Sequence, residues 1–163
     1  MIKNKPFFII TAIGIFSTLI FLYIFVYGLA VRTVKSSVLI EKAYPNLTPA
    51  EYLNELKISA SKNNLKILEV RKERDFYIIQ MVNEKYLDEV SAVSPQATLL
   101  AIVNVVIYNL GDGVGVVATN PYLWDIIYPS NYIDDKAESF SNELSDIFDG
   151  IYWSLKEKKR ELK

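Results

Sequence analysis

Two asparagines lie where the chain could form a polar binding site. Asn83 directly follows the apolar stretch "FYIIQMV", and Asn104 lies inside "IVNVVIYN"; both stretches predict β-strands. If the two side chains face each other, their amides could hold the polar group of a small ligand. The alternative is that they bond to the local backbone or cap turns, which is the commoner role of such side chains. Asn83 and Asn104 are therefore a candidate ligand pocket with a structural alternative.

Three carboxylates, Asp134, Asp135 and Glu138, begin the last predicted helix, which runs from Asp134 to about Leu162. They could bind a hard cation or work as an acid–base pair. Carboxylates in the first turn of a helix also interact favourably with the helix macrodipole, and we favour that explanation. The sequence therefore predicts no catalytic residue and no metal ligand at this place.

The composition removes several kinds of chemistry. The chain has neither cysteine nor histidine, which excludes disulfides, thiol nucleophiles, thiolate metal sites, imidazole acid–base catalysis and haem ligation by histidine. An enzyme would have to rely on carboxylates, lysine, serine or tyrosine, and these form no recognisable set. The net charge of −1 shows no nucleic-acid footprint. We expect a protein that is not an enzyme and that uses no cofactor.

An aromatic segment is the best candidate for a partner surface. The stretch "NPYLWDIIYPSNYIDD" contains two prolines and four large aromatic residues, which are Tyr122, Trp124, Tyr128 and Tyr132. Tyrosine and tryptophan are enriched at protein interfaces. The segment could equally be a lid that packs over the domain's own core, and the sequence leaves both interpretations open.

Charge is unevenly distributed after residue 83. From Glu84 to Leu155 acidic residues far outnumber Lys85 and Lys136, whereas the tail "KEKKREL" is basic. An acidic face could steer a basic partner, and a basic helix end could lie on anionic lipid. We favour the plainer interpretation, which is a solvated surface with lysines placed favourably at a helix C-terminus.

The elements that position these residues begin with an anchor. The stretch from Phe7 to Ala30 has no charged residue and would span ~36 Å as a helix, enough for a ~30 Å hydrocarbon core. A cleaved signal peptide is the alternative, but its apolar region is usually only ~7–15 residues long. We expect a single-pass membrane protein with a cytoplasmic N-terminus and an extracytoplasmic C-terminal domain, since long domains translocate largely regardless of charge.

A second apolar stretch, "LLAIVNVVIYNLGDGVGVV", predicts a β-hairpin rather than another crossing. Its apolar part before the Asp112-Gly113 turn signal has about twelve residues, fewer than the ~17–25 that a membrane helix needs. Its β-branched residues indicate a strand covered on both faces.

The other predicted elements complete one domain. They are a strand over Arg32–Glu41, a helix capped by Thr48 and Glu51, a hairpin over Leu65–Val82, a short helix in "NEKYLDEVSA" and the last helix. The predicted division is residues 1–30 for the anchor and 31–163 for the domain.

Three stretches resemble a known family. "VNEKYLDEV", "IVNVVIYNLGDGVGVVATNP" and "AESFSNELSDIFDGIYWSL" are similar to the domain-of-unknown-function family 302, and the likeness covers about Val34 to Lys156. The resemblance implies an α+β fold, β-α-β(4)-α, with helices packed on one face of an antiparallel sheet, often as a dimer and with no established enzymatic activity.

The chain departs from that family at two motifs. The family's cysteine-asparagine-proline and proline-cysteine-asparagine motifs stand here as Val82-Asn83-Glu84 and Ile102-Val103-Asn104. The chain resembles a membrane-anchored member without the family's cysteines. Thiol, metal or haem roles suggested for relatives are therefore not expected here.

Two functions remain in view. The first is a membrane-anchored, non-enzymatic interaction module, an accessory subunit of a respiratory or envelope complex, which binds the bilayer through its helix and a protein partner or a second copy through its domain. The alternative is a small-ligand-binding domain, with a pocket between the sheet and the C-terminal helix bordered by Asn83 and Asn104.

Overall fold

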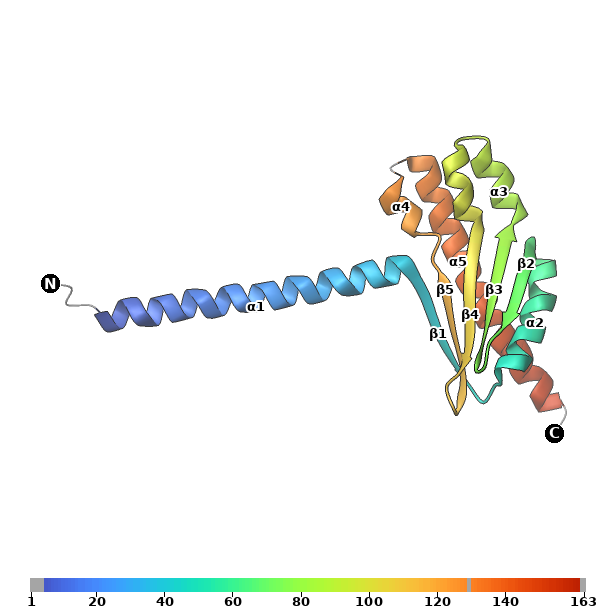
Figure 1. Cartoon of the computed structure of the whole chain (residues 1–163), viewed down its shortest axis with the longest axis horizontal. Coiled ribbons are helices and arrows are strands. Elements are labelled where there is room, and N and C mark those ends of the chain that lie inside the picture. Colours follow the sequence, from blue (N-terminus) through green and yellow to red (C-terminus); the bar gives the residue numbers. More distant parts are fainter. Residues whose placement is uncertain (1–4, 129, 162–163) are drawn as a thin grey trace. The chain divides into compact units, whose positions relative to one another are not determined.

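The computed structural model describes residues 5–128 and 130–161, and the chain divides into two compact units, residues 1–36 and 37–163. The described part of the first unit, residues 5–36, belongs to helix α1 (Lys5–Val38). Its segment Phe8–Ala30 is long and apolar enough to cross a membrane, and none of it is buried within the protein. Figure 1 shows this helix in blue.

The predicted strand over Arg32–Glu41 is wrong over most of its length. Helix α1 continues to Val38, and strand β1 occupies Leu39–Pro45. A helix that has already begun adds residues at low cost, and no proline interrupts the chain until Pro45. The short alternating pattern after Ala30 is therefore outweighed, and the strand begins only where β5 is available to pair with it.

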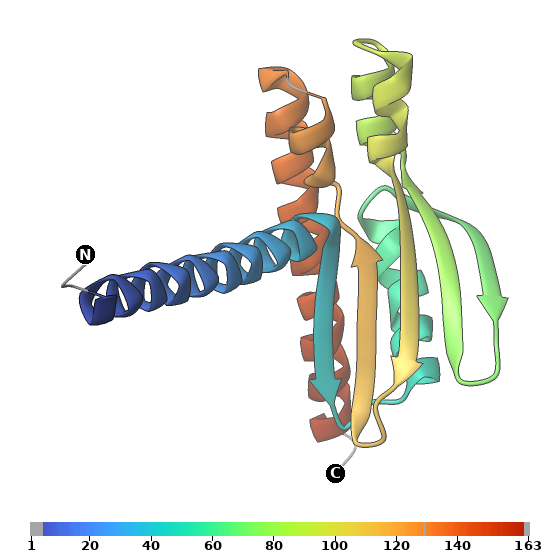
Figure 2. The ribbon, with the colours of Figure 1, turned by 60° about the vertical axis from the view of Figure 1, so that its left-hand side comes forward.

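The second unit is built on one antiparallel sheet, which confirms the α+β class and the predicted element order (Figures 1 and 2). Its strand order is β1-β5-β4-β3-β2. The remaining strands are β2 (Leu65–Lys72), β3 (Phe76–Asn83), β4 (Ile102–Asn109) and β5 (Gly113–Thr119). The apolar stretch at 99–117 is thus a short helical turn and a hairpin of the folded domain.

The β4–β5 turn lies one residue earlier than the sequence signal suggested. Leu110 N–H donates to Gly113 O at 2.9 Å, so the two turn residues are Gly111 and Asp112. Gly111 has φ +91°, a conformation that favours glycine. Gly113 is instead the first residue of β5.

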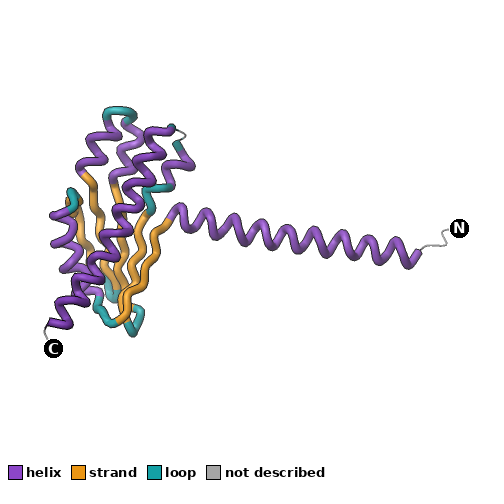
Figure 3. The backbone as a smooth tube through the Cα atoms, turned by 180° about the vertical axis from the view of Figure 1, so that it is seen from behind, coloured by secondary structure: helices purple, strands orange, loops and turns teal. Residues whose placement is uncertain are grey.

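Helices α2 (Pro49–Lys62) and α5 (Asn131–Glu161) cover one face of the sheet (Figure 3). The predicted capping box of α2 is confirmed, because Thr48 Oγ1 accepts from Glu51 N–H and Glu51 accepts from Thr48 N–H. The main core fills the space between these layers, and its largest wholly buried side chains include Tyr52, Phe140 and Phe148.

A second, smaller core lies where three short helices meet the N-terminal part of α5. These helices are α3 (Glu84–Ser91), the 3-10 helix η1 (Pro95–Ala101) and α4 (Leu123–Ile127). The core contains Val90, Ala97, Leu100, Ile133 and Ala137. In Figure 1 these helices stand together beyond one end of the sheet.

The expectation that the central strand is covered on both faces is wrong. In β4 the side chains of Val103, Val105 and Ile107 are buried, whereas Asn104 is exposed and Val106 is half-buried. Successive side chains of a strand point to opposite faces, so this alternation means that one face of the sheet is open. Within the described residues of the second unit, helices cover only the opposite face of the sheet.

Candidate functional site

The open face of the sheet carries an apolar centre between charged edges. The strand register aligns one row of side chains across it, in the order Glu41, Val117, Val106, Ile78 and Arg71. The three central side chains are half-buried, and the two charged ones are exposed. An antiparallel sheet can leave one face to water, but a row of half-buried apolar side chains on that face offers apolar area that a partner can cover.

A second row lies beside the first and is partly covered by an aromatic ring. Tyr108 pairs with Gly115 on one side and with Phe76 on the other. A Cβ atom placed on Gly115 would lie 2.6 Å from Tyr108 Cε1, so the ring rests directly on the glycine backbone. An aromatic side chain that covers a strand glycine restores packing the glycine lacks.

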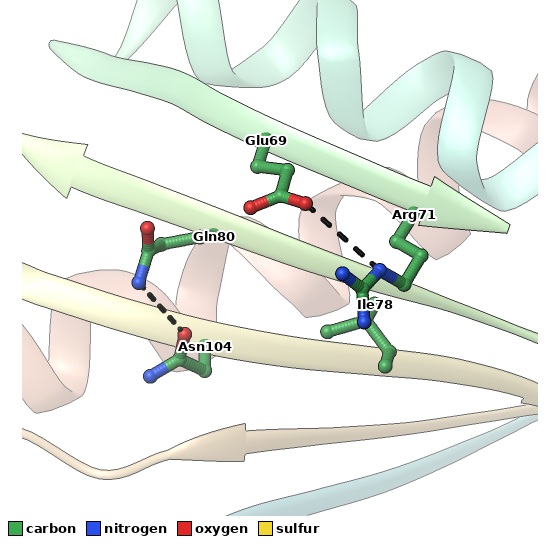
Figure 4. Close-up of a pocket in the computed structure, with 5 residues that line it drawn as sticks. All are labelled: Glu69, Arg71, Ile78, Gln80 and Asn104. Atoms are coloured by element: carbon green, nitrogen blue, oxygen red, sulfur yellow. Dashed lines mark hydrogen bonds and ion pairs between the residues drawn. The ribbon is translucent and has the colours of Figure 1, made fainter.

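The third row is polar, and with Arg71 and Ile78 of the first row it lines the pocket drawn in Figure 4. Gln80 Nε2 donates to Asn104 Oδ1 at 3.3 Å, and Asn104 N–H donates to Thr119 Oγ1 at 3.0 Å. Glu69 lies 4.0 Å from Arg71 on the edge strand β2. With Ile78, these β2, β3 and β4 side chains line a shallow depression of about 180 Å³.

A larger groove of about 330 Å³ adjoins this row where the strands meet the short helices. One wall is apolar and includes Leu99 of η1 and Leu123 and Trp124 of α4. The other wall is polar and includes Asn104, Thr119 and Asn120 at the strand ends. The groove can therefore take a ligand that has an apolar body and a polar group.

The structure does not bring Asn83 and Asn104 together. Asn104 lies on the open face, whereas Asn83 is wholly buried on the helix-covered face. Asn83 Oδ1 accepts from Tyr86 N–H at 3.2 Å and caps α3, while its Nδ2 has no partner. The space between the sheet and α5 is filled by core side chains such as Phe140 and Phe148.

The aromatic segment is divided between its own core and the surface. Trp124 and Tyr128 pack against the second core, and Tyr128 Oη donates to Ser94 Oγ at 3.0 Å. Tyr132 is exposed, and Lys136 Nζ lies 5.5 Å from its ring centroid. Tyr122 is half-buried and precedes α4. Trp124 is the member that also lines the groove.

Asp134 lies in the first turn of α5, where a carboxylate interacts favourably with the helix macrodipole. The other two candidate carboxylates, Asp135 and Glu138, are exposed to solvent. Across residues 5–128 and 130–161, no three carboxylates gather closely enough to hold a metal ion.

Sequence reasoning missed a charged cluster on the helix-covered side. Asp149 of α5 accepts from Lys42 Nζ at 2.8 Å and from Tyr44 Oη at 2.7 Å. Burial raises the pKa of Asp149, but these two hydrogen bonds outweigh burial and leave the pKa below its usual value. Burial and the neighbouring Asp149 raise the pKa of Tyr44, so its hydroxyl stays protonated at neutral pH. The cluster fastens α5 to β1 and supplies no activated nucleophile.

The basic tail is largely occupied by contacts within the domain. Lys158 Nζ donates to Glu55 at 2.6 Å, and Lys159 Nζ donates to the Asn46 carbonyl at 3.0 Å. These contacts support the plainer interpretation of the tail.

The fold has a counterpart among solved structures. The crystal structure of the uncharacterized conserved protein DUF302 from Bacillus stearothermophilus superposes with a TM-score of 0.60. The chain has a DUF302-like fold. The identity is 10%, and the match covers 69% of this chain and 96% of that chain, so it shows the fold alone. No protein-family model and no curated protein matches the chain.

Proposed function

We propose that this chain is a membrane-anchored, non-enzymatic member of the DUF302-like fold group that serves as an accessory subunit of a membrane complex. The length and apolar composition of Phe8–Ala30 support its role as the anchor. We place the domain outside the cytoplasm because long domains translocate largely regardless of their charge. The observation that carries the proposal is the open sheet face, which opposes the helical layer and presents half-buried apolar side chains. Binding to another protein surface removes these side chains from water.

The proposed occupant of this face is a second copy of the chain. We propose a two-fold axis that runs along the strands, because this symmetry gives both copies the same sheet end on the same side and so allows both anchors to enter one bilayer. Such an axis places the central strand β4 against itself and the edge strand β1 against β2 of the other copy. The strands of two packed sheets cross at up to about 30°, so each strand lies only approximately over its counterpart in the second copy.

The face is self-complementary about that axis. In the first row, Glu41 on β1 faces Arg71 on β2 of the second copy, and Val106 faces its own equivalent. In the polar row, Thr119 faces Gln80 of the second copy. Opposite charges and hydrogen-bonding groups thus meet at the rim, and apolar groups meet at the centre.

The size of the face indicates a weak pairing that the membrane strengthens. Five strands of about seven residues cover roughly 24 Å by 24 Å, which is about 600 Å². A standard stable interface buries about 800 Å² on each partner. Anchoring both copies in one bilayer raises their effective concentration and compensates for the smaller area.

Single cysteines test the pairing directly, because the chain contains none. In membranes that hold the full-length chain, Val106→Cys is treated with a bismaleimide that spans about 10 Å, the usual distance between packed sheets. Ser61→Cys, on the exposed side of α2, is the matched control. We expect a covalent dimer with Val106→Cys and none with Ser61→Cys. Equal cross-linking at both positions, or none at Val106, refutes the pairing.

The groove beside Trp124 favours a second candidate function, which is the binding of a small ligand. The ligand would bind at the strand ends and not between the sheet and α5. Native mass spectrometry of the chain extracted with its lipids would show a bound molecule as added mass. If this function holds, Trp124→Ala loses the added mass, whereas Trp153→Ala retains it, because Trp153 is exposed on α5 away from the groove. Added mass that survives in both variants, or is absent from the wild type, refutes the candidate.

A further inference from the structure

The chain itself limits how far one end of the domain can lie from the apolar segment. Leu39 begins β1 and pairs with Thr119, and Asn120 N–H donates to the Val38 carbonyl at 2.8 Å. Only residues 31–36 separate the apolar segment from the second unit. Even fully extended, such a link spans about 20 Å. If Phe8–Ala30 spans a bilayer, this link keeps the sheet end that bears Leu39 and Thr119 within about 20 Å of the membrane surface.

The same end exposes large apolar side chains. Leu99 of η1 is 58% exposed, Ile127 of α4 is 56% exposed, and Val93 between α3 and η1 is 53% exposed. Trp124 lies on α4 with Ile127 and shares the groove with Leu99 and Thr119. Tryptophan and exposed aliphatic side chains together are typical of a surface that enters the membrane interface.

We propose that this membrane-proximal surface, Val93, Leu99, Trp124 and Ile127, docks into the interfacial layer of the bilayer that holds the anchor. The lipid acyl boundary is its occupant, and the groove beside Trp124 receives part of a lipid. The inference rests on the proposed membrane anchoring and goes beyond it, because it assigns a second lipid contact to the folded domain. It does not require the pairing of two copies.

The charges near this surface define the kind of lipid. Asp88 and Asp135 are exposed on α3 and α5, and the Lys136 ammonium is already paired with Glu89. An acidic surrounding is repelled by anionic headgroups. The contact is therefore driven by apolar burial and favours neutral lipid, such as phosphatidylcholine, over phosphatidylglycerol.

The two tryptophans provide a matched test. Trp124 lies at the membrane-proximal surface, whereas Trp153 lies twenty residues beyond Ile133 on the same helix, a rise of ~30 Å. The C-terminal part of α5 lies beside the far end of β1, since Lys159 bonds to the Asn46 carbonyl. Trp153 is exposed but lies far from the proposed membrane-docking surface. Its fluorescence should therefore be quenched by lipid only if a different surface contacts the membrane.

The experiment uses the full-length chain reconstituted into phosphatidylcholine vesicles that contain brominated phosphatidylcholine. Trp153→Phe leaves Trp124 as the only tryptophan, and Trp124→Phe leaves Trp153. We expect about a twofold loss of Trp124 emission, as for a ring at the interface, and no loss for Trp153. Adding Leu99→Ser and Ile127→Ser to Trp153→Phe should remove the quenching, and replacing part of the lipid by phosphatidylglycerol should reduce it.

The possible failures are distinguishable. If the chain does not float with the vesicles after a carbonate wash, the anchoring fails and this inference fails with it. If it floats and Trp124 is not quenched, or both tryptophans are quenched equally, the docking is refuted while the anchoring stands.

Discussion

Two glycines of one strand respond very differently to the same substitution. A Cβ atom on Gly113 overlaps the Tyr44 carbonyl oxygen and lies 2.9 Å from Pro45 Cα, and these are backbone atoms of the neighbouring strand β1. The three atoms nearest to a Cβ atom on Gly115 all belong to the ring of Tyr108. Backbone paired in a sheet cannot move aside without breaking the pairing, whereas an aromatic ring on an open face can rotate.

The magnitudes follow from this difference. Overpacking costs about 1–3 kcal/mol, and we place Gly113→Ala at the upper end, about 3 kcal/mol, because its neighbour is backbone. Gly115 lies inside β5, where replacing glycine by alanine returns about 0.5–1 kcal/mol of chain entropy and offsets most of the cost of displacing Tyr108, whereas Gly113 is the first residue of the strand and does not gain this return. Gly115→Ala should therefore lie within about 1 kcal/mol of the wild type. At about 4 °C per kcal/mol, Gly113→Ala lowers Tm by about 12 °C.

The assay is thermal unfolding of the full-length chain in mild detergent, followed by the fluorescence of Trp124 and Trp153. Tyr108→Ala combined with Gly115→Ala is the control, since it removes the displaced ring. It should show no further loss from the added methyl group. If Gly113→Ala and Gly115→Ala lower Tm equally, the placement of β1 against β5 and of Tyr108 over Gly115 is wrong.

Three further predictions concern caps, charge and topology. Thr48→Ala removes the capping box of α2 and should lower the free energy of unfolding by about 1 kcal/mol in urea titrations; an unchanged midpoint contradicts the cap. Burial raises the pKa of Glu55, but hydrogen bonds from Lys158 and Ser154 bring it below 4.5. Its stabilisation is present above the unfolded pKa and is lost as pH falls through the folded pKa, so Glu55→Gln should flatten the loss of stability below about pH 5; identical pH profiles refute this. Ser61→Cys should react with an impermeant thiol reagent on intact cells, and reaction only after lysis reverses the orientation.

Local signals in the sequence predict the elements well. The Thr48–Glu51 spacing locates the start of α2 because both partners of the capping box lie within one turn. The charged residues 73–75 locate the turn between β2 and β3 for a similar reason. These features depend on contacts between near neighbours, which the order of residues displays directly.

Features that depend on distant partners are not visible in the same way. One face of the sheet is open because, among the described residues, helices cover only the other face. The β-branched residues of β4 predict a strand, but they do not reveal how many of its faces are covered. Asp149 and Lys42 are 107 positions apart, so no spacing signals their contact. The separation of Asn83 from Asn104 depends on strand register, and a shift of one residue exchanges the two faces of a strand.

The most direct test of the central claim is a count of copies in the native membrane. Extraction of the full-length chain into polymer-bounded lipid discs keeps the anchors in bilayer, and mass spectrometry of single discs gives the number of chains and any other subunits. We predict two copies held together, with other membrane subunits alongside them, and a return to one copy when Val106→Glu places like charges at the centre of the sheet face. One copy in every disc of the wild-type chain contradicts the proposal that this face pairs two copies of the chain.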